Sequence, residues 1–297
     1  MKLQSQLTGL HLPIVTPFAA AGHLDAPALK HNLAAWQTTG ISGYVIGGST
    51  GERVHLDEAE YLELIETARA EVPPEFAFVV GAGQASVIGT KREIDRAARL
   101  GADAVLVITP HYYRAAMTQE ALVHYYRAVA DASPVPLLLY SMPALTGIKL
   151  EPETIGRLSE HENIIGVKDS SNDVSAFAET VRLCPPDFAV LTGNGTVLLD
   201  ALRAGATGAI LAVGCVVPEA CLAIFAAAKT EDQERANALQ ARLTPLAAAV
   251  TTRFGIGGLK TALDLAGYRG GAVRAPLISP DNAARAEIKR LLEETAG

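Results

Sequence analysis

The sequence has few cysteines, and their spacing does not suggest a shared role. Cys184, Cys215 and Cys221 are an odd number in 297 residues, and none of them forms a CxxC pair. Disulfide frameworks need paired cysteines in short secreted chains, and structural zinc sites need closely spaced ones. The seven histidines are scattered without HxH or HExxH spacing. The sequence therefore indicates neither a disulfide framework nor a metal site.

Long apolar runs and clusters of positive charge are also missing. No run reaches the roughly 18 apolar residues that a membrane-spanning helix needs, and residues 1–6 lack the apolar core of a signal peptide. The net charge is −7, and no cluster of Lys and Arg offsets it. We therefore expect a soluble, cytoplasmic protein that binds neither nucleic acid nor a membrane. An organelle transit peptide removed before Met1 is compatible with this expectation.

Short apolar segments alternate with longer amphipathic ones along most of the chain. The apolar segments begin near Leu10, Gly43, Phe76, Ala104, Val135, Ile164, Phe188 and Gly208. They are apolar throughout, as parallel strands covered on both faces are, and their spacing of roughly 20 to 33 residues fits a βα unit. Eight such units with right-handed crossovers close most simply into a (β/α)8 TIM barrel. The alternative is a doubly wound open sheet, but Thr16-Pro17-Phe18 at the first βα turn lacks the dinucleotide fingerprint.

The segments between the strands have the pattern of amphipathic helices. Over residues 57–72, apolar residues recur at spacings of three and four, and Asp57 followed by Glu60 predicts an N-terminal capping pair. Glycines just before a strand predict left-handed helix C-caps. These glycines are Gly40, Gly101 and Gly205.

After about Phe225 the pattern changes to helices without intervening strands. Residues 231–254 have a helical pattern, and Asp281, which follows Ser279-Pro280, is a favourable helix start. We therefore expect two regions, a catalytic (β/α)8 barrel over residues 1–225 and a small helical appendage over residues 226–297.

The sixth predicted strand ends in a lysine that requires an explanation. Burial of an unpaired ammonium is costly, so a buried Lys168 would tend to lose its proton and become a nucleophile toward ketones. The alternative is that Lys168 points into water where the strand ends. Because side chains alternate along a strand, Gly166, Lys168 and Ser170 share one side and Asp169 faces the other. Gly166 would leave room for the lysine along the barrel wall, which favours the nucleophile.

In a barrel of this type the active site lies at the C-terminal ends of the strands. The second strand leads into Gly48-Ser49-Thr50-Gly51, whose hydroxyls and backbone N–H groups suit a carboxylate. The fifth strand ends at Tyr140, whose phenol can donate and accept a proton. Both motifs also have a simpler interpretation. Residues 48–51 would then form an ordinary glycine-rich turn, and Tyr140 would only fill the mouth of the barrel with an aromatic ring.

These motifs occur together in one known family. Gly-Ser-Thr-Gly-Glu after the second strand, Tyr-Tyr after the fourth, Tyr-x-x-Pro after the fifth and Val-Lys-Asp-Ser on the sixth resemble the dihydrodipicolinate synthase / N-acetylneuraminate lyase superfamily. The resemblance covers essentially the whole chain. It implies a lyase, a class I aldolase that handles pyruvate through a Schiff base and uses no metal or organic cofactor. The partners would be a small 2-keto acid and an aldehyde.

The resemblance also implies roles for individual residues. Lys168 is similar to the Schiff-base lysine, and Tyr140 to the tyrosine that relays protons in catalysis. Ser49 and Thr50, beside Gly48, match the pair that binds the pyruvate carboxylate.

Other positions match the surroundings of the family's pocket. Tyr112 matches a catalytic-site tyrosine that many members insert into a neighbouring subunit, which implies a homo-oligomer, usually a homotetramer. Gly193 and Ile210 match backbone positions that line the pocket. Ser170 is a candidate contact for the other polar end of the substrate.

Within the superfamily the motifs are most similar to those of 4-hydroxy-2-oxoglutarate aldolase. The similar segments are residues 109–114, 140–144, 249–256 and 270–277. Dihydrodipicolinate synthases usually have arginine where this chain has Leu145, and loss of the guanidinium removes a carboxylate partner. Neuraminate lyases usually carry Lys-x-Thr instead of Lys168-Asp169-Ser170. The 4-hydroxy-2-oxoglutarate enzyme has Asn in place of Thr50.

The expected reaction is cleavage of a 4-hydroxy-2-keto acid to pyruvate and an aldehyde, with 4-hydroxy-2-oxoglutarate giving glyoxylate. The alternatives are an aldolase for neuraminate or a 2-keto-3-deoxy sugar acid, and a dihydrodipicolinate synthase, which Leu145 disfavours. A further alternative, from another class, is a non-catalytic barrel that binds a keto acid. Lys168 and Tyr140 argue against it, because a scaffold needs neither.

Overall fold

In the computed structural model, which describes residues 6–230 and 232–296, parallel strands close into a barrel in sequence order. The eight strands found in these residues are Gly9–Pro13 (β1), Gly43–Ile46 (β2), Ala77–Ala82 (β3), Ala104–Ile108 (β4), Leu137–Ser141 (β5), Ile164–Asp169 (β6), Ala189–Thr192 (β7) and Gly208–Ile210 (β8). The predicted TIM barrel is confirmed, and the open-sheet alternative is wrong because β1 pairs with β8.

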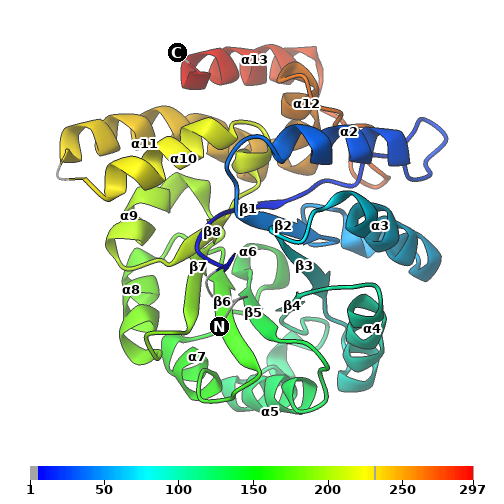
Figure 1. Cartoon of the computed structure of the whole chain (residues 1–297), viewed down its shortest axis with the longest axis vertical. Helices are drawn as coiled ribbons and strands as arrows, with labels where there is room; N and C mark the ends of the chain where they lie inside the picture. Colours follow the sequence, from blue (N-terminus) through cyan, green and yellow to red (C-terminus); the bar gives the residue numbers. More distant parts are fainter. Residues whose placement is uncertain (1–5, 231, 297) are drawn as a thin grey trace.

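Helices surround the barrel on its outer side (Figure 1). They are Ala26–Trp36 (α2), Glu58–Glu71 (α3), Val87–Arg99 (α4), Gln119–Ala130 (α5), Pro152–Leu158 (α7), Val174–Leu183 (α8) and Leu198–Arg203 (α9). The short helix Pro143–Thr146 (α6), which follows β5, lies inside this ring in Figure 1. Short 3-10 turns follow four of the strands, at Arg53–His55 (η1), Arg114–Ala116 (η2), Gly195–Val197 (η3) and Val213–Cys215 (η4).

The predicted helix signals are present. The Asp57 side chain accepts a hydrogen bond from Glu60 N at 2.9 Å, and the Glu60 carboxylate accepts one from Asp57 N at 3.0 Å. This reciprocal pair satisfies two N–H groups at the start of α3 that have no partner within the helix. Gly40, Gly101 and Gly205 have φ values of 89°, 88° and 101°, as the C-cap prediction requires.

Apolar side chains fill both faces of the barrel sheet. One buried cluster lies inside the barrel and includes Val79, Leu106, Leu138 and Leu191. A larger cluster lies between the strands and the helices, where Trp36 is fully buried. Coverage on both sides explains why the strands are apolar throughout.

The helices after β8 gather on one side of the barrel, near α2 (Figure 1). They are Pro218–Ala228 (α10), Gln233–Ala248 (α11), the π-helical Ala249–Arg253 (η5), Gly255–Leu265 (α12) and Asn282–Ala296 (α13). Asp281 accepts a hydrogen bond from Ala284 N at 2.8 Å, as expected for the start of α13. The predicted boundary at residue 225 falls in α10, and division of the chain there stays a prediction. In the part of the chain that the structure describes, no helix is long and apolar enough to cross a membrane.

The sequence did not predict α12. Gly255, Gly257 and Gly258 stand in its first turn, and glycine has a low helix propensity. The helix forms because its buried residues pack against the rest of the C-terminal segment and the barrel. Among them is Lys260, which lies on the buried face of the helix.

Candidate functional site

Lys168 lies at the C-terminal end of β6, where its side chain is buried. The residue is 4% exposed and is paired in register with Tyr140 on β5. Lys168 Nζ lies 4.4 Å from the centroid of the Tyr140 ring. The alternative in which Lys168 points into water is therefore wrong.

Asp169 faces away from this lysine, as predicted from strand alternation. Its carboxylate accepts hydrogen bonds from Ser171 N at 2.8 Å and Ser171 Oγ at 3.1 Å. Burial raises the pKa of Asp169, and the hydrogen bonds from Ser171 oppose that rise. Asp169 therefore holds the start of the loop after β6 instead of pairing with Lys168.

Gly193, and not Gly166 as predicted, is the glycine that lies against the Lys168 side chain. A Cβ on Gly166 would lie 2.5 Å from Ala189 O and 2.7 Å from Leu138 Cδ2, so the atoms nearest to this glycine belong to β7 and β5 and not to the lysine. A Cβ on Gly193 would lie 2.7 Å from Lys168 Cε and 2.0 Å from Ser170 Oγ. Gly193, after β7, is thus the glycine that leaves space for the lysine, and it brings Ser170 into the same group.

Tyr140 connects the lysine to the turn after β2. Its hydroxyl lies 2.9 Å from Ser49 Oγ, within hydrogen-bond distance. Tyr140 is 3% exposed, and it belongs to the cluster inside the barrel together with Ile210, which is 1% exposed. The structure therefore brings Lys168, Tyr140 and Ser49 together at the mouth of the barrel.

The turn after β2, residues 48–51, presents backbone donors and is called the β2 turn below. Gly51 N donates to Gly48 O at 3.0 Å, and Glu52 N donates to Ser49 O at 3.1 Å. In the part of the chain that the structure describes, the N–H groups of Ser49 and Thr50 donate no hydrogen bond. Two adjacent unused N–H groups beside two hydroxyls form a set of donors that suits a carboxylate.

Two ion pairs beside the β2 turn, one buried and one partly buried, could not be read from the sequence. Lys260 Nζ donates to Glu52 Oε1 at 2.5 Å, and Arg53 forms an ion pair with Glu93. The Glu52 and Glu93 side chains are 1% and 5% exposed. The one feature of the sequence that indicates the first pair is Lys260, a lysine on the apolar face of a helix. That helix, α12, was not predicted because it begins with glycines.

Leu145 and Tyr112 are exposed in the single chain. Leu145, on α6, is 58% exposed, and Tyr112, in the loop after β4, is 78% exposed. The Tyr112 ring contacts Tyr113, with centroids 5.1 Å apart. The insertion of Tyr112 into a neighbouring subunit stays a prediction.

A guanidinium lies beside the segment that carries Leu145. A Cβ on Gly147 would lie 3.3 Å from Nε and Nη1 of Arg114, which belongs to η2. Gly147 ends α6 in the left-handed conformation, two residues after Leu145. A positive charge therefore lies near Leu145 at the rim of the barrel. It belongs to Arg114 in the loop after β4, and not to the segment after β5 that carries Leu145.

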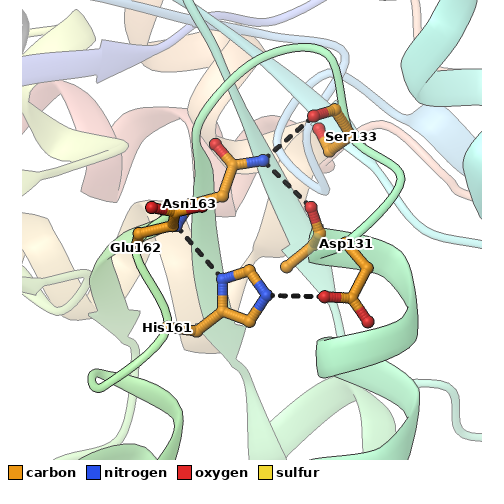
Figure 2. A pocket seen from close by; sticks show the side chains of 6 residues that line it. Asp131, Ser133, His161, Glu162 and Asn163 are labelled. Carbon is orange, nitrogen blue, oxygen red and sulfur yellow. Dashed lines mark hydrogen bonds and ion pairs between the residues drawn. The ribbon is translucent and has the colours of Figure 1, made fainter.

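An open cleft of about 560 Å³ lies at the opposite end of the barrel, where α5 leads to β5 and α7 leads to β6. Figure 2 shows His161 between the backbone of Asn163 and the carboxylate of Asp131. Asn163 N donates to Nδ1 of the imidazole at 3.1 Å, and Nε2 donates to Asp131 Oδ1 at 3.1 Å. The Asn163 side chain donates to the carbonyls of Ala130 and Ser133, both at 3.0 Å. These hydrogen bonds join two loops at the N-terminal face of the barrel. In barrels of this type, residues at that face contribute to stability and not to catalysis.

Known proteins resemble this chain over most or nearly all of its length. The family model described as "Dihydrodipicolinate synthetase family" matches residues 6–295. A 4-hydroxy-tetrahydrodipicolinate synthase from an Exiguobacterium species is 33% identical over 287 residues, with 97% of each chain covered.

Solved structures give the same result. A dihydrodipicolinate synthase from Bacillus anthracis matches with a TM-score of 0.93 at 26% identity, over 97% of this chain and 98% of that one. A prophage protein of the dihydrodipicolinic acid synthase family from E. coli K12, solved in complex with pyruvate, matches with a TM-score of 0.90 at 29% identity. That match also covers 97% of this chain and 98% of the other.

Proposed function

Because the chain belongs to the dihydrodipicolinate synthetase family, we propose that it joins pyruvate to an aldehyde, or separates the two, through a Schiff base at Lys168. Members of this family are pyruvate-dependent lyases and synthases of the class I aldolase type, and the chain is an enzyme of this class. The expected superfamily is thus confirmed. The relatives are named for 4-hydroxy-tetrahydrodipicolinate synthesis and not for 4-hydroxy-2-oxoglutarate cleavage.

The observation that carries the proposal is the hydrogen-bonded group at the barrel mouth. The Tyr140 hydroxyl lies 2.9 Å from Ser49 Oγ, and the Tyr140 ring lies 4.4 Å from Lys168 Nζ. The unused N–H groups of Ser49 and Thr50 adjoin this contact. A nucleophile, a proton relay and a carboxylate site are therefore adjacent, as an imine-forming enzyme needs.

In the proposed reaction, the neutral amine of Lys168 attacks the keto carbon of pyruvate, and water leaves as the imine forms. The imine acts as an electron sink, so a proton can leave C3 and the resulting enamine can attack the aldehyde carbon. The aldehyde oxygen takes up a proton relayed by Tyr140, and water releases the product from Lys168. The reverse sequence cleaves a 4-hydroxy-2-keto acid. The β2 turn holds the carboxylate throughout, and the scheme requires no metal or organic cofactor.

Trapping the imine tests the proposal directly. The protein is incubated with pyruvate and borohydride, which reduces the imine to a stable secondary amine, and is then weighed and sequenced by mass spectrometry. We expect one pyruvate-derived adduct per chain, on Lys168. An unmodified mass, or an adduct on another residue, would contradict the proposal.

Two observations favour different aldehydes. The names of the curated relatives favour synthesis of 4-hydroxy-tetrahydrodipicolinate. Leu145 favours the second candidate, 4-hydroxy-2-oxoglutarate with glyoxylate as the aldehyde, because synthases usually carry arginine at that position. Arg114 offers a guanidinium to a carboxylate-bearing aldehyde in either case. Measurement of kcat/KM for both reactions, with a sugar aldehyde as a third substrate, distinguishes the candidates.

Tyr112 and Tyr113 also support the proposal of a homotetramer. Both rings are at least 70% exposed in the single chain, and adjacent exposed aromatic residues mark interaction sites. Sedimentation of the purified protein would give the mass of the assembly. A Tyr112→Ala variant with a lower mass would support a subunit contact at this loop, whereas an unchanged tetramer would place the contact elsewhere.

A further inference from the structure

A buried ion pair stands directly behind the β2 turn (residues 48–51). Lys260 Nζ, on α12, donates to Glu52 Oε1 at 2.5 Å, and neither side chain is more than 2% exposed. The other two protons of the ammonium go to the carbonyls of Thr16 at 2.8 Å and Ala272 at 2.6 Å. All three donors of Lys260 therefore hold neighbouring segments of the chain.

The pair controls the β2 turn through the backbone of Glu52. Among the residues that the structure describes, Glu52 is the one non-glycine with a positive φ, 54°. This conformation is unfavourable for a residue with a Cβ, so contacts have to hold it. Oε2 of Glu52 accepts hydrogen bonds from His55 Nδ1 at 3.0 Å and from Arg274 N at 3.1 Å. Oε1 of Glu52 accepts one from Lys260. Glu52 N donates to Ser49 O, so the orientation of Glu52 sets that of the turn.

Thr16 connects the same lysine to Gly51, the last residue of the turn and the neighbour of Glu52. Its hydroxyl donates to Gly51 O at 2.6 Å, and its carbonyl accepts from Lys260. Gly51 follows Thr50, whose N–H group is one of the two unused donors. Loss of the lysine would therefore loosen the contacts of both Gly51 and Glu52, at the end of the turn that follows Thr50.

The stability of the fold does not by itself explain why a buried ion pair, Glu52 and Lys260, occupies this position. The desolvation of two ions offsets much of their attraction, and apolar residues of similar volume often stabilise a fold equally well. Burial lowers the pKa of Lys260, and the hydrogen bond with Glu52 opposes that change. A network of charge-assisted hydrogen bonds provides what apolar contacts cannot, a fixed direction for each bonded group.

We propose that Glu52 and Lys260 are positioning residues that keep the N–H groups of Ser49 and Thr50 directed at the substrate carboxylate. The inference rests on the proposed function, because it requires pyruvate to bind at the β2 turn. It gives α12 a role in the site, since the helix fixes the turn without touching the substrate. A positioning defect would weaken pyruvate binding and leave imine formation at saturating pyruvate nearly unchanged.

The test is borohydride trapping of the full-length protein over a range of pyruvate concentrations, with the Lys168 adduct quantified by mass spectrometry. For Glu52→Gln and Lys260→Met, we expect the half-saturating pyruvate concentration to rise about tenfold or more, as expected from loss of a charge-assisted hydrogen bond. The trapping rate at saturation should stay within about threefold of wild type, because the reacting groups are intact. Leu243→Ala, at a fully buried site on α11, is the control for lost stability and should leave half-saturation unchanged.

A folded single variant that half-saturates at the wild-type concentration would overturn the proposal, and so would an equal rise in Leu243→Ala. If one unpaired buried charge prevents folding, the double variant Glu52→Gln/Lys260→Met removes both charges and is measured in the same way. Wild-type half-saturation in the double variant would overturn the proposal. Absence of any adduct in the wild-type protein would instead contradict the proposed function. An adduct in wild type with unaffected variants contradicts only this inference.

Discussion

The Tyr140 hydroxyl lies 2.9 Å from Ser49 Oγ, although 91 positions separate the two residues in the sequence. The ring of the same tyrosine lies 4.4 Å from Lys168 Nζ. Tyr140 therefore contacts both the proposed nucleophile and the proposed carboxylate site. A phenol hydrogen-bonded to a hydroxyl can pass a proton between substrate and protein, because each group both donates and accepts.

Replacement of Tyr140 by phenylalanine removes the hydroxyl and keeps the ring. We expect kcat to fall about 10²- to 10⁴-fold, the usual cost of losing a general acid–base group. Lys168 remains in place, so borohydride should still trap pyruvate on it, at a lower rate. Steady-state kinetics and mass spectrometry of the adduct measure the two effects.

Tyr126→Phe is the matched control. Tyr126, on α5, is a buried tyrosine between the strands and the helices, and its hydroxyl donates to Val107 O at 3.0 Å. Its loss should lower the free energy of unfolding by about 1 kcal/mol and leave kcat nearly unchanged. Equal effects of Tyr140→Phe and Tyr126→Phe on kcat would show that Tyr140 has no part in proton transfer.

Gly193 is the position where a single added methyl group should disturb the lysine. A Cβ there would lie 2.7 Å from Lys168 Cε and 2.0 Å from Ser170 Oγ, so both side chains have to move. Because small displacements of a reacting group are costly, we expect Gly193→Ala to lower the trapping rate about 10²-fold. In Gly156→Ala, the added Cβ would meet Leu183 Cβ at 3.3 Å on the helical side of the barrel. This control should trap pyruvate at the wild-type rate, and equal loss in both variants would contradict the prediction.

The fold and the central group of the site could be predicted because both depend on local patterns. Each strand is a short apolar run, and closure of eight of them places every strand end at one mouth. Lys168, Tyr140 and Ser49 meet for this reason alone. Strand alternation was likewise sufficient to separate Asp169 from Lys168.

The supporting contacts could not be predicted because they depend on how distant segments dock. Glu52 and Lys260 are 208 positions apart, and their contact requires the position of α12. The prediction that Gly166 makes room for Lys168 was wrong for a similar reason, since the atoms nearest to it belong to Ala189 and Leu138 on the two neighbouring strands. Neither the tilt of a helix nor the direction of a neighbouring side chain is contained in a periodic pattern.

Leu145→Arg tests how the site recognises the aldehyde. Leu145 is 58% exposed, so an arginine can be placed there without a buried charge. We expect kcat/KM for a carboxylate-bearing aldehyde to rise about tenfold or more, as one charge-assisted hydrogen bond allows. Pyruvate trapping and the reaction of a neutral aldehyde should stay at wild-type rates. The uncharged control is Leu145→Met, and an equal gain for charged and neutral aldehydes would show that the arginine acts in another way.

His11 should make the stability of the barrel depend on pH. The imidazole is fully buried on β1, and Nε2 donates to Gln6 O at 2.9 Å. Nδ1 has no hydrogen-bond partner among the residues that the structure describes. Burial lowers the pKa of His11, so the folded protein keeps the ring neutral at pH values where the unfolded chain binds a proton. Stability is then unaffected above the unfolded pKa of about 6.5 and falls as the pH drops below it.

Between pH 7.5 and 5.5, we expect the wild-type protein to lose up to about 1.4 kcal/mol more unfolding free energy than His11→Gln, which cannot titrate. Urea unfolding followed by circular dichroism at the two pH values measures the difference. His124→Gln is the control, because the His124 side chain is 79% exposed, and it should retain the wild-type dependence on pH. An equal loss in wild type and His11→Gln would show that other groups cause the acid sensitivity.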